Sequence, residues 1–196
     1  MNSNKIPILN GLVLVGGKSS RMGQDKGLLN YHGIPQREFT YHLIEKFCET
    51  TWFSCREDQV VSLSGFNSIV DQVPNSGSFG AIFSAFRQNS NCAWLVVACD
   101  LPLLDEETIQ MLIDKRNPEK IATAYNSPID HKPEPLIAIW EPSVMAFLEK
   151  GKNQIKTGPR KILMMNDANL INSENPDALK NANYPEDFRE IKSRLK

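Results

Sequence analysis

The segment 11–26, GLVLVGGKSSRMGQDK, constrains the fold of this chain most strongly. It begins with a short apolar, β-branched run that ends abruptly at Gly16 and Gly17. Such a run predicts a buried strand, and a strand that opens into glycines exposes backbone N–H groups that an anion can approach closely. Arg21 adds a planar fork of donors and Lys26 a mobile ammonium, both suited to phosphate oxygens. We therefore interpret the segment as a loop that binds a nucleoside triphosphate.

Two better-known phosphate loops are excluded by spacing. A Walker A loop requires a glycine five positions before the Gly of Gly-Lys-Ser, and that position is Leu12 here. The dinucleotide fingerprint G-x-G-x-x-G is not found around Gly16 and Gly17. On chemistry alone, an ordinary strand-to-helix turn with solvated charges stays open as the alternative.

Strand and helix patterns alternate along the rest of the chain. This alternation predicts an α/β fold with a mostly parallel central sheet, in one domain that spans residues 1–196. We expect the strands at residues 11–15, 51–54, 68–71, 93–99, 120–125, 136–140 and 168–171. We expect the helices at residues 35–47, 82–86, 105–113, 144–148, 155–165 and 185–195, and a proline-rich turn at 128–135.

Two aspartates follow predicted strands and are candidates for the site. Asp71 ends a short strand ahead of a glycine- and serine-rich loop, and Asp100 ends the most apolar run of the chain, residues 93–99. In open α/β sheets, ligands bind beyond the carboxyl ends of the strands. These carboxylates are therefore expected at the same edge as the glycine loop. A carboxylate beside phosphate oxygens is the typical setting for Mg²⁺.

Composition excludes several other classes of protein. The formal net charge of −1 gives no reason to expect binding to nucleic acid or to an anionic membrane. No apolar run is long enough for a transmembrane helix, and the polar N-terminus does not resemble a signal peptide, so we expect a cytoplasmic protein. The four cysteines show no C-x-x-C pair and are expected to be buried free thiols.

The motifs also resemble those of a known family. Leu14-Val15-Gly16-Gly17, Arg21-Met22-Gly23 and Asp25-Lys26 are similar to the L-A-G-G-x-x-x-R-M-G-x-D-K pattern of the molybdenum cofactor guanylyltransferases. The resemblance implies a three-layer, Rossmann-like nucleotidyltransferase fold with helices on both faces of the sheet. It also implies that residues 14–17 and Lys26 bind the nucleotide. Val15 departs from the family's alanine. Its larger side chain is expected to narrow the pocket for the base and thereby to affect which nucleotide binds.

Three further segments extend the resemblance. Cys99-Asp100-Leu101-Pro102 is similar to the family's C-D-x-P, whose aspartate binds Mg²⁺, and Asp71 is similar to an aspartate that contacts the nucleotide. Residues 181–187, NANYPED, resemble the family's N-x-N-T-P-E-D/E, which implies a metal-binding role for Asn183. The family's asparagine after the second strand has no clear match in Ser54-Cys55-Arg56, and its histidine before a proline is Lys132 here.

The resemblance implies a Mg²⁺-dependent enzyme that transfers GMP from GTP to molybdopterin-bound molybdenum cofactor. Arg21, Lys26 and Asp100 would be catalytic, and Asp100 and Asn183 would hold the metal. The expected partners are GTP, a molybdopterin-type phosphorylated acceptor and proteins that deliver the cofactor, and the chain is expected to be a monomer. A cytidylyltransferase, another small-phosphate nucleotidyltransferase and a non-catalytic nucleotide-binding regulator are the alternatives.

Overall fold

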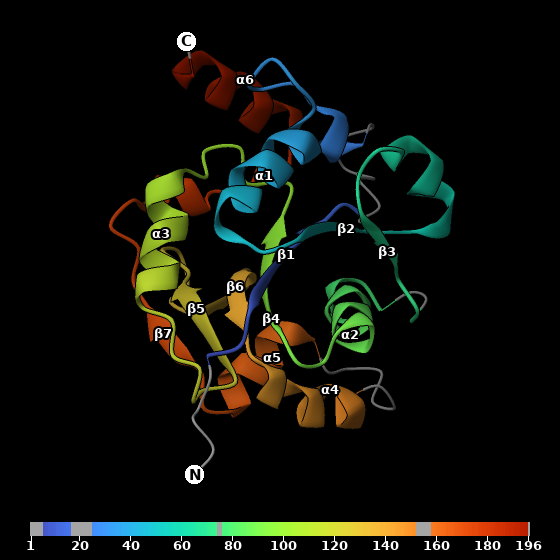
Figure 1. Cartoon of the computed structure of the whole chain (residues 1–196). Coiled ribbons are helices and arrows are strands. Elements are labelled where there is room, and N and C mark those ends of the chain that lie inside the picture. Colours follow the sequence, from blue (N-terminus) through green and yellow to red (C-terminus); the bar gives the residue numbers. More distant parts are fainter. Residues whose placement is uncertain (1–5, 17–24, 74–75, 152–157, 196) are drawn as a thin grey trace.

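The computed structural model describes residues 6–16, 25–73, 76–151 and 158–195. Within them lies a seven-stranded sheet in the order β3-β2-β1-β4-β6-β5-β7 (Figure 1). The strands are β1 (Leu9–Leu14), β2 (Thr51–Cys55), β3 (Ser68–Val70), β4 (Ala93–Ala98), β5 (Ala122–Asn126), β6 (Pro133–Trp140) and β7 (Asn169–Ile171). β6 runs antiparallel to β4 and β5, and the other pairs are parallel. The predicted α/β fold with a mostly parallel sheet is confirmed.

Helices cover both faces of the sheet. They are α1 (Gln36–Ile44), α2 (Ser78–Gln88), α3 (Glu106–Asp114), α4 (Met145–Gly151), α5 (Pro159–Met165) and α6 (Pro185–Arg194). Short 3-10 helices lie between these elements: η1 (Lys26–Leu28), η2 (Glu45–Phe47), η3 (Glu57–Leu63), η4 (Pro142–Val144) and η5 (Pro176–Leu179). No helix in the described part of the chain is long and apolar enough to span a membrane.

The alternation of side chains along β4 divides the core between the two faces. Leu95 and Val97 pack with residues of α1 and α3 in one apolar cluster. Trp94 and Val96 point the other way and pack with residues of α2, α4 and α5. Successive residues of a strand face opposite sides of a sheet, so an uninterrupted apolar run fits a strand covered on both faces. The predicted three-layer arrangement follows from this packing.

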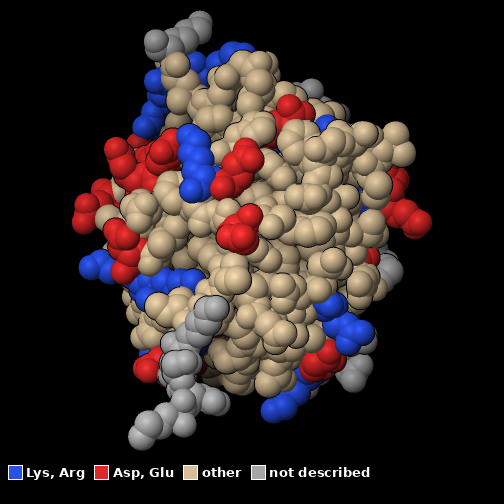
Figure 2. Space-filling model, viewed as in Figure 1, with Lys and Arg blue, Asp and Glu red and all other residues tan. Residues whose placement is uncertain are grey.

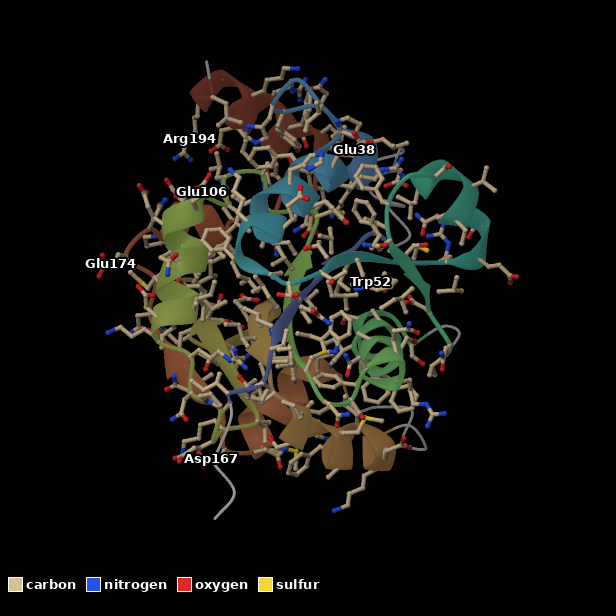
Figure 3. All side chains as sticks on the ribbon, viewed as in Figure 1. Glu38, Trp52, Glu106, Asp167, Glu174 and Arg194 are labelled. Carbon is tan, nitrogen blue, oxygen red and sulfur yellow. The ribbon has the colours of Figure 1, made fainter. Side chains whose placement is uncertain are left out.

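Charged side chains lie on the outside of these layers. Acidic residues gather on one side of the face shown in Figure 2, over α3. In Figure 3, Glu106 and Glu174 lie at the periphery, whereas Trp52 of β2 lies inward, against the cluster that contains α2. The four cysteines are free; Cys55, Cys92 and Cys99 are buried and Cys48 is half-buried. The expectation of free thiols is therefore confirmed, with Cys48 less buried than predicted.

The element boundaries differ from the prediction in several places, and α2, expected at residues 82–86, extends over Ser78–Gln88. β6 begins at Pro133 rather than at residue 136. Pro133 is the first residue of the strand, and Pro135 lies where the β5–β6 register shifts, two places at which a strand tolerates proline. The helix expected at 155–165 is described from Pro159 onward, and residues 152–157 lie outside the described part. η3 was not predicted, because its sequence, EDQVVSL, has no helical period of apolar residues.

Candidate active site

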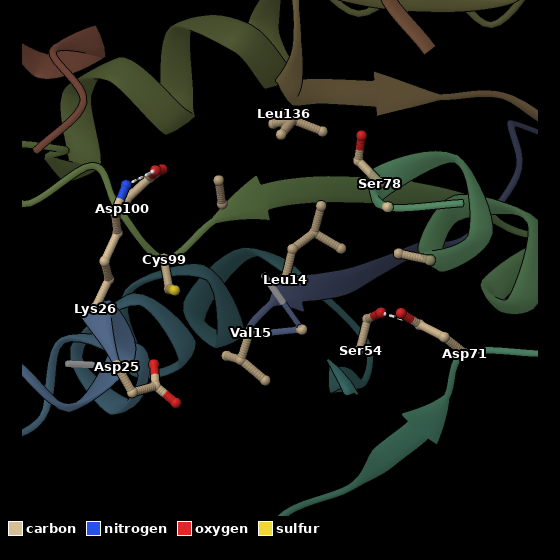
Figure 4. A pocket seen from close by; sticks show the side chains of 14 residues that line it. Leu14, Val15, Asp25, Lys26, Ser54, Asp71, Ser78, Cys99, Asp100 and Leu136 are labelled. Carbon is tan, nitrogen blue, oxygen red and sulfur yellow. Dashed lines mark hydrogen bonds and ion pairs between the residues drawn. The ribbon is translucent and has the colours of Figure 1, made fainter. Parts of the chain in front are cut away.

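A cavity of about 290 Å³ opens at the carboxyl-terminal edge of the sheet. It lies at the end of β1, which has β2 on one side and β4 on the other. From β1 the chain first builds the sheet outward through β2 and β3, and then continues on the opposite side with β4. Such switch points are the usual ligand sites of open α/β sheets. Figure 4 shows the side chains that border the cavity: Leu14, Val15, Gly16, Asp25, Lys26, Ser54, Asp71, Gly77, Ser78, Ala81, Ala98, Cys99, Asp100 and Leu136.

One end of the cavity holds a lysine between two oxygen acceptors. Lys26 Nζ lies 3.3 Å from Asp100 Oδ2 and donates to Asn183 Oδ1 at 2.6 Å. The Lys26 and Asp100 side chains are only 18% and 24% exposed, so water screens their attraction less than at the surface. Three predicted site residues from distant parts of the chain therefore meet at one point.

Backbone and capping hydrogen bonds position these three side chains. Asp25 caps η1 by accepting from Gly27 N at 2.9 Å, which fixes the turn that carries Lys26. Ala182 N donates to the backbone oxygen of Asp100 at 2.9 Å, so the segment before α6 runs alongside the Asp100 turn. Asp187 Oδ2 then accepts from Asn183 N at 2.7 Å and holds that residue at the start of α6.

The other end of the cavity holds a second pair, Ser54 and Asp71. Ser54 Oγ donates to Asp71 Oδ1 at 2.5 Å, and Asp71 N donates to Cys55 O at 3.0 Å, which continues the β2–β3 ladder by one residue. Burial raises the pKa of Asp71 above its usual value, although the Ser54 bond and the Arg56 charge oppose this rise. Figure 4 shows this pair separated from Lys26 and Asp100 by Leu14 and Val15.

Val15 and Gly16 form the floor between the two ends. Val15 borders the cavity but is only 3% exposed, because it packs into the core with Val13 and Phe53. Most of its extra bulk relative to alanine is therefore accommodated in the core. A Cβ atom at Gly16 would lie 3.3 Å from Asp71 Oδ2, so a side chain here would crowd that carboxylate.

The structure brings most of the predicted site residues to one cavity. Leu14, Val15, Gly16, Asp71, Lys26 and Asp100 border it, and Asn183 reaches it through Lys26. Gly17 and Arg21 lie outside the described residues. Sequence reasoning missed Ser54 as the partner of Asp71. The available signal was its place at the end of a strand, where a polar side chain can face a ligand.

The donor set at the lysine end suits a hard divalent cation. Asp100 and Asn183 present a carboxylate and an amide oxygen to the same cationic group, which shows that this point favours positive charge. Among the described residues, no group of three or more His, Cys, Asp or Glu side chains converges on one point. Mg²⁺ commonly takes only one or two protein ligands and completes its shell from substrate and water.

Cys99, which also borders the cavity, does not add a charge to it. Burial and the nearby Asp100 raise the pKa of Cys99, so its thiol stays protonated.

Comparison with known proteins relates this chain to a family. The model of the MobA-like NTP transferase domain matches residues 11–170. A molybdenum cofactor guanylyltransferase of Campylobacter jejuni subsp. doylei is 31% identical over 195 residues, which cover 96% of this chain and 97% of that protein. The molybdenum cofactor biosynthesis bifunctional protein of Synechocystis sp. is 35% identical over 185 residues, but the chain spans only 53% of its length.

Solved structures share the fold. The molybdopterin-guanine dinucleotide biosynthesis protein A from Archaeoglobus fulgidus superposes with a TM-score of 0.78 at 23% identity. The superposition covers 94% of this chain and 97% of that one. A nucleotidyl transferase from Methanothermobacter superposes with a TM-score of 0.75 at 13% identity. These likenesses establish a common nucleotidyltransferase-like architecture.

Proposed function

The chain belongs to the MobA-like NTP transferase family, and from this premise we propose that it transfers GMP from GTP to the terminal phosphate of molybdopterin-bound molybdenum cofactor. The names of several full-length relatives, as molybdenum cofactor guanylyltransferases, support this choice of reaction. One structural observation carries the proposal. A single cavity holds the Lys26, Asp100 and Asn183 cluster at one end and Asp71 at the other.

The reaction needs no protein nucleophile. A phosphate oxygen of the acceptor attacks the α-phosphorus of GTP, a new P–O bond forms, and the bond between the α-phosphorus and the bridging oxygen breaks. Pyrophosphate leaves with that oxygen and its electron pair. Because a phosphate monoester is already anionic at neutral pH, catalysis rests on positioning and on neutralising the charge of the phosphates.

The residues of the cavity divide these tasks. Gly16 lets the nucleotide approach the backbone closely, and Asp71 contacts the nucleoside end. Lys26 neutralises charge on the phosphates, and we assign Gly17 and Arg21 to the same loop on the sequence pattern alone. Asp100 and Asn183 would hold Mg²⁺, which acts as a Lewis acid and a template for the triphosphate when it is bound.

Asp71 gives a chemical reason to expect guanine. A guanine base has N–H donors at N1 and N2, and a carboxylate can accept hydrogen bonds from both. Cytosine has only its exocyclic amine as a donor on the corresponding edge. Asp71 Oδ1 is already engaged by Ser54, so Oδ2, which faces Gly16, is the oxygen available to a base.

Calorimetric titration with GTP, CTP, ATP and UTP, each with and without Mg²⁺, tests the proposal. We expect GTP to bind most tightly and its affinity to rise with Mg²⁺. A preference for CTP would replace the guanylyltransferase with a cytidylyltransferase that uses the same mechanism. If none of the four nucleotides binds, the assignment of the cavity is wrong.

A further inference from the structure

Two consecutive backbone carbonyls after β1 are held by side chains of one neighbouring segment. Gln59 Nε2 donates to Val15 O at 3.1 Å, and Arg56 Nη1 donates to Gly16 O at 2.8 Å. Val15 N in turn donates to Ser54 O at 3.0 Å. The chain is therefore fixed at three backbone groups, the Val15 N–H, the Val15 carbonyl and the Gly16 carbonyl, at the point where it leaves the sheet.

The Gln59 side chain uses both ends of its amide in this arrangement. Its Oε1 accepts from Arg56 N at 3.1 Å while its Nε2 reaches Val15. Gln59 is only 6% exposed, so each of these bonds is costly to lose. Arg56 is oriented by Asp58, which accepts from its Nε and Nη2 at 2.9 and 3.0 Å.

η3 is itself anchored to the core, so it can act as a rigid support. Arg37 of α1 donates from Nη2 to Ser62 O at 2.8 Å, and Ser62 Oγ donates to Gln59 O at 2.7 Å. Leu63 at its end is 2% exposed and packs into the cluster beneath α1. The segment that donates to the Val15 and Gly16 carbonyls is therefore held in place by the core.

These bonds determine where the Gly16 N–H points. In a planar trans peptide the C=O of one residue and the N–H of the next point in opposite directions. Because the Val15 carbonyl points to Gln59, the Gly16 N–H points away from η3, toward the β4 side of the cavity that Gly16 borders. The Leu14 carbonyl also points to that side, where it accepts from Cys99 N. We find no acceptor for the Gly16 N–H among the described residues.

We infer that Gln59 and Arg56 are positioning residues that hold the Gly16 N–H toward an oxygen of the bound nucleotide. This inference rests on the proposed function. Neither side chain is among the described residues that border the cavity, so both act through the backbone. If the Val15–Gly16 peptide rotated, it would present a carbonyl oxygen to the ligand in place of a donor, and an anionic or carbonyl acceptor would be repelled.

Two substitutions separate this role from a general role in stability. Gln59→Met keeps the size of the side chain but removes its donor and its acceptor, and Arg56→Met removes the bond to Gly16 at a position that is 36% exposed. Gln110→Met on α3 and Arg189→Met on α6 are the matched controls. Gln110 is exposed and bonds only locally to Asp114 among the described residues, and Arg189 is 74% exposed.

The experiment measures GTP affinity by calorimetry in the presence of Mg²⁺, the thermal midpoint of each variant, and the Gly16 amide signal by ¹⁵N NMR. We expect Gln59→Met and Arg56→Met each to weaken GTP binding about three- to tenfold, the equivalent of one lost hydrogen bond. The shift of the Gly16 amide signal on adding GTP should shrink in both variants. Both control variants should match the wild type.

The outcomes distinguish the inference from the function on which it rests. If the wild type binds GTP and the folded Gln59→Met and Arg56→Met variants bind it within twofold, the inference is wrong and the proposed function stands. If the wild type binds no nucleotide, the proposed function fails and the inference fails with it. If Gln59→Met does not fold, the more exposed Arg56→Met variant decides between these results.

Discussion

Lys26 Nζ donates to Asn183 Oδ1 at 2.6 Å, although 157 positions of the sequence separate the two residues. The same ammonium lies 3.3 Å from Asp100 Oδ2. The lysine ammonium thus lies between two oxygen atoms, at the position that we assign to a divalent cation. The cation and the ammonium cannot both lie there, because like charges at such short range repel strongly.

The first prediction concerns metal binding without nucleotide. We expect Lys26→Met to bind Mn²⁺ more tightly than the wild type, because the competing ammonium is gone. In the wild type, GTP should raise the affinity for Mn²⁺, since its phosphates offer Lys26 a new partner. Electron paramagnetic resonance of free Mn²⁺ measures both effects. Lys192→Met on the exposed face of α6 is the control, and equal Mn²⁺ affinity in all three proteins would contradict the competition.

The second prediction concerns turnover. Lys26→Ala should reduce the rate of pyrophosphate release by more than about tenfold, because the phosphates lose a neutralising charge. Asp100→Asn should remove the dependence of the rate on Mg²⁺. Rates are measured with GTP and the molybdopterin-bound acceptor over a range of Mg²⁺ concentrations. Wild-type rates in both variants would rule out the assigned roles of these residues.

The third prediction concerns the pH dependence of stability. Burial raises the pKa of Asp71 above its usual value of 3.8, so the folded protein binds that proton more tightly than the unfolded chain does. The Asp71 carboxyl therefore favours folding at low pH, and this contribution is lost as the pH rises through its raised pKa. Asp71→Asn should increase the free energy of unfolding near pH 7, with a smaller gain at about pH 4, while it weakens GTP binding.

Urea unfolding at both pH values provides the measurement, and Asp130→Asn provides a control of opposite sign. The backbone N–H of Lys132 lowers the pKa of Asp130, so its carboxylate stabilises the fold above the usual pKa and loses this effect as the pH falls. The third prediction fails if Asp71→Asn and Asp130→Asn change stability in the same direction as the pH rises.

The fourth prediction concerns a buried ion pair far from the cavity. Arg116 donates to both carboxylate oxygens of Glu141, at 2.6 and 3.0 Å, and the Glu141 side chain is completely buried. Arg116→Met should lower the free energy of unfolding by about 3–5 kcal/mol, because it leaves a buried carboxylate without its partner. Replacing the exposed Arg189 by Met should change stability by less than about 0.5 kcal/mol. Chemical denaturation measures both, and similar values for the two would refute the role of burial.

The sequence alone determined the elements whose causes are local. The apolar runs at residues 11–15 and 93–99 predicted β1 and β4, because a strand covered on both faces needs apolar side chains on both. Asp105 and Pro185 marked the starts of α3 and α6, because a capping side chain and a proline at the first helical position act within one turn. The strand–glycine pattern also indicated which edge of the sheet would bind a ligand.

The tertiary structure decided what depends on contacts between distant segments. The short turn after β5 returns the chain as an antiparallel β6, whose pairing with β4 cannot be deduced from either strand alone. η3 has no periodic apolar pattern, and the bonds from Gln59 and from Arg56 before it go to Val15 O and Gly16 O, 44 and 40 positions earlier in the sequence, so nothing local indicates them. Lys26 was expected at phosphates, but its bond to Asn183 exists only because the segment before α6 pairs with the Asp100 turn. Local sequence sets local conformation, whereas the partner of a side chain at the site depends on which distant segments the packed sheet brings together.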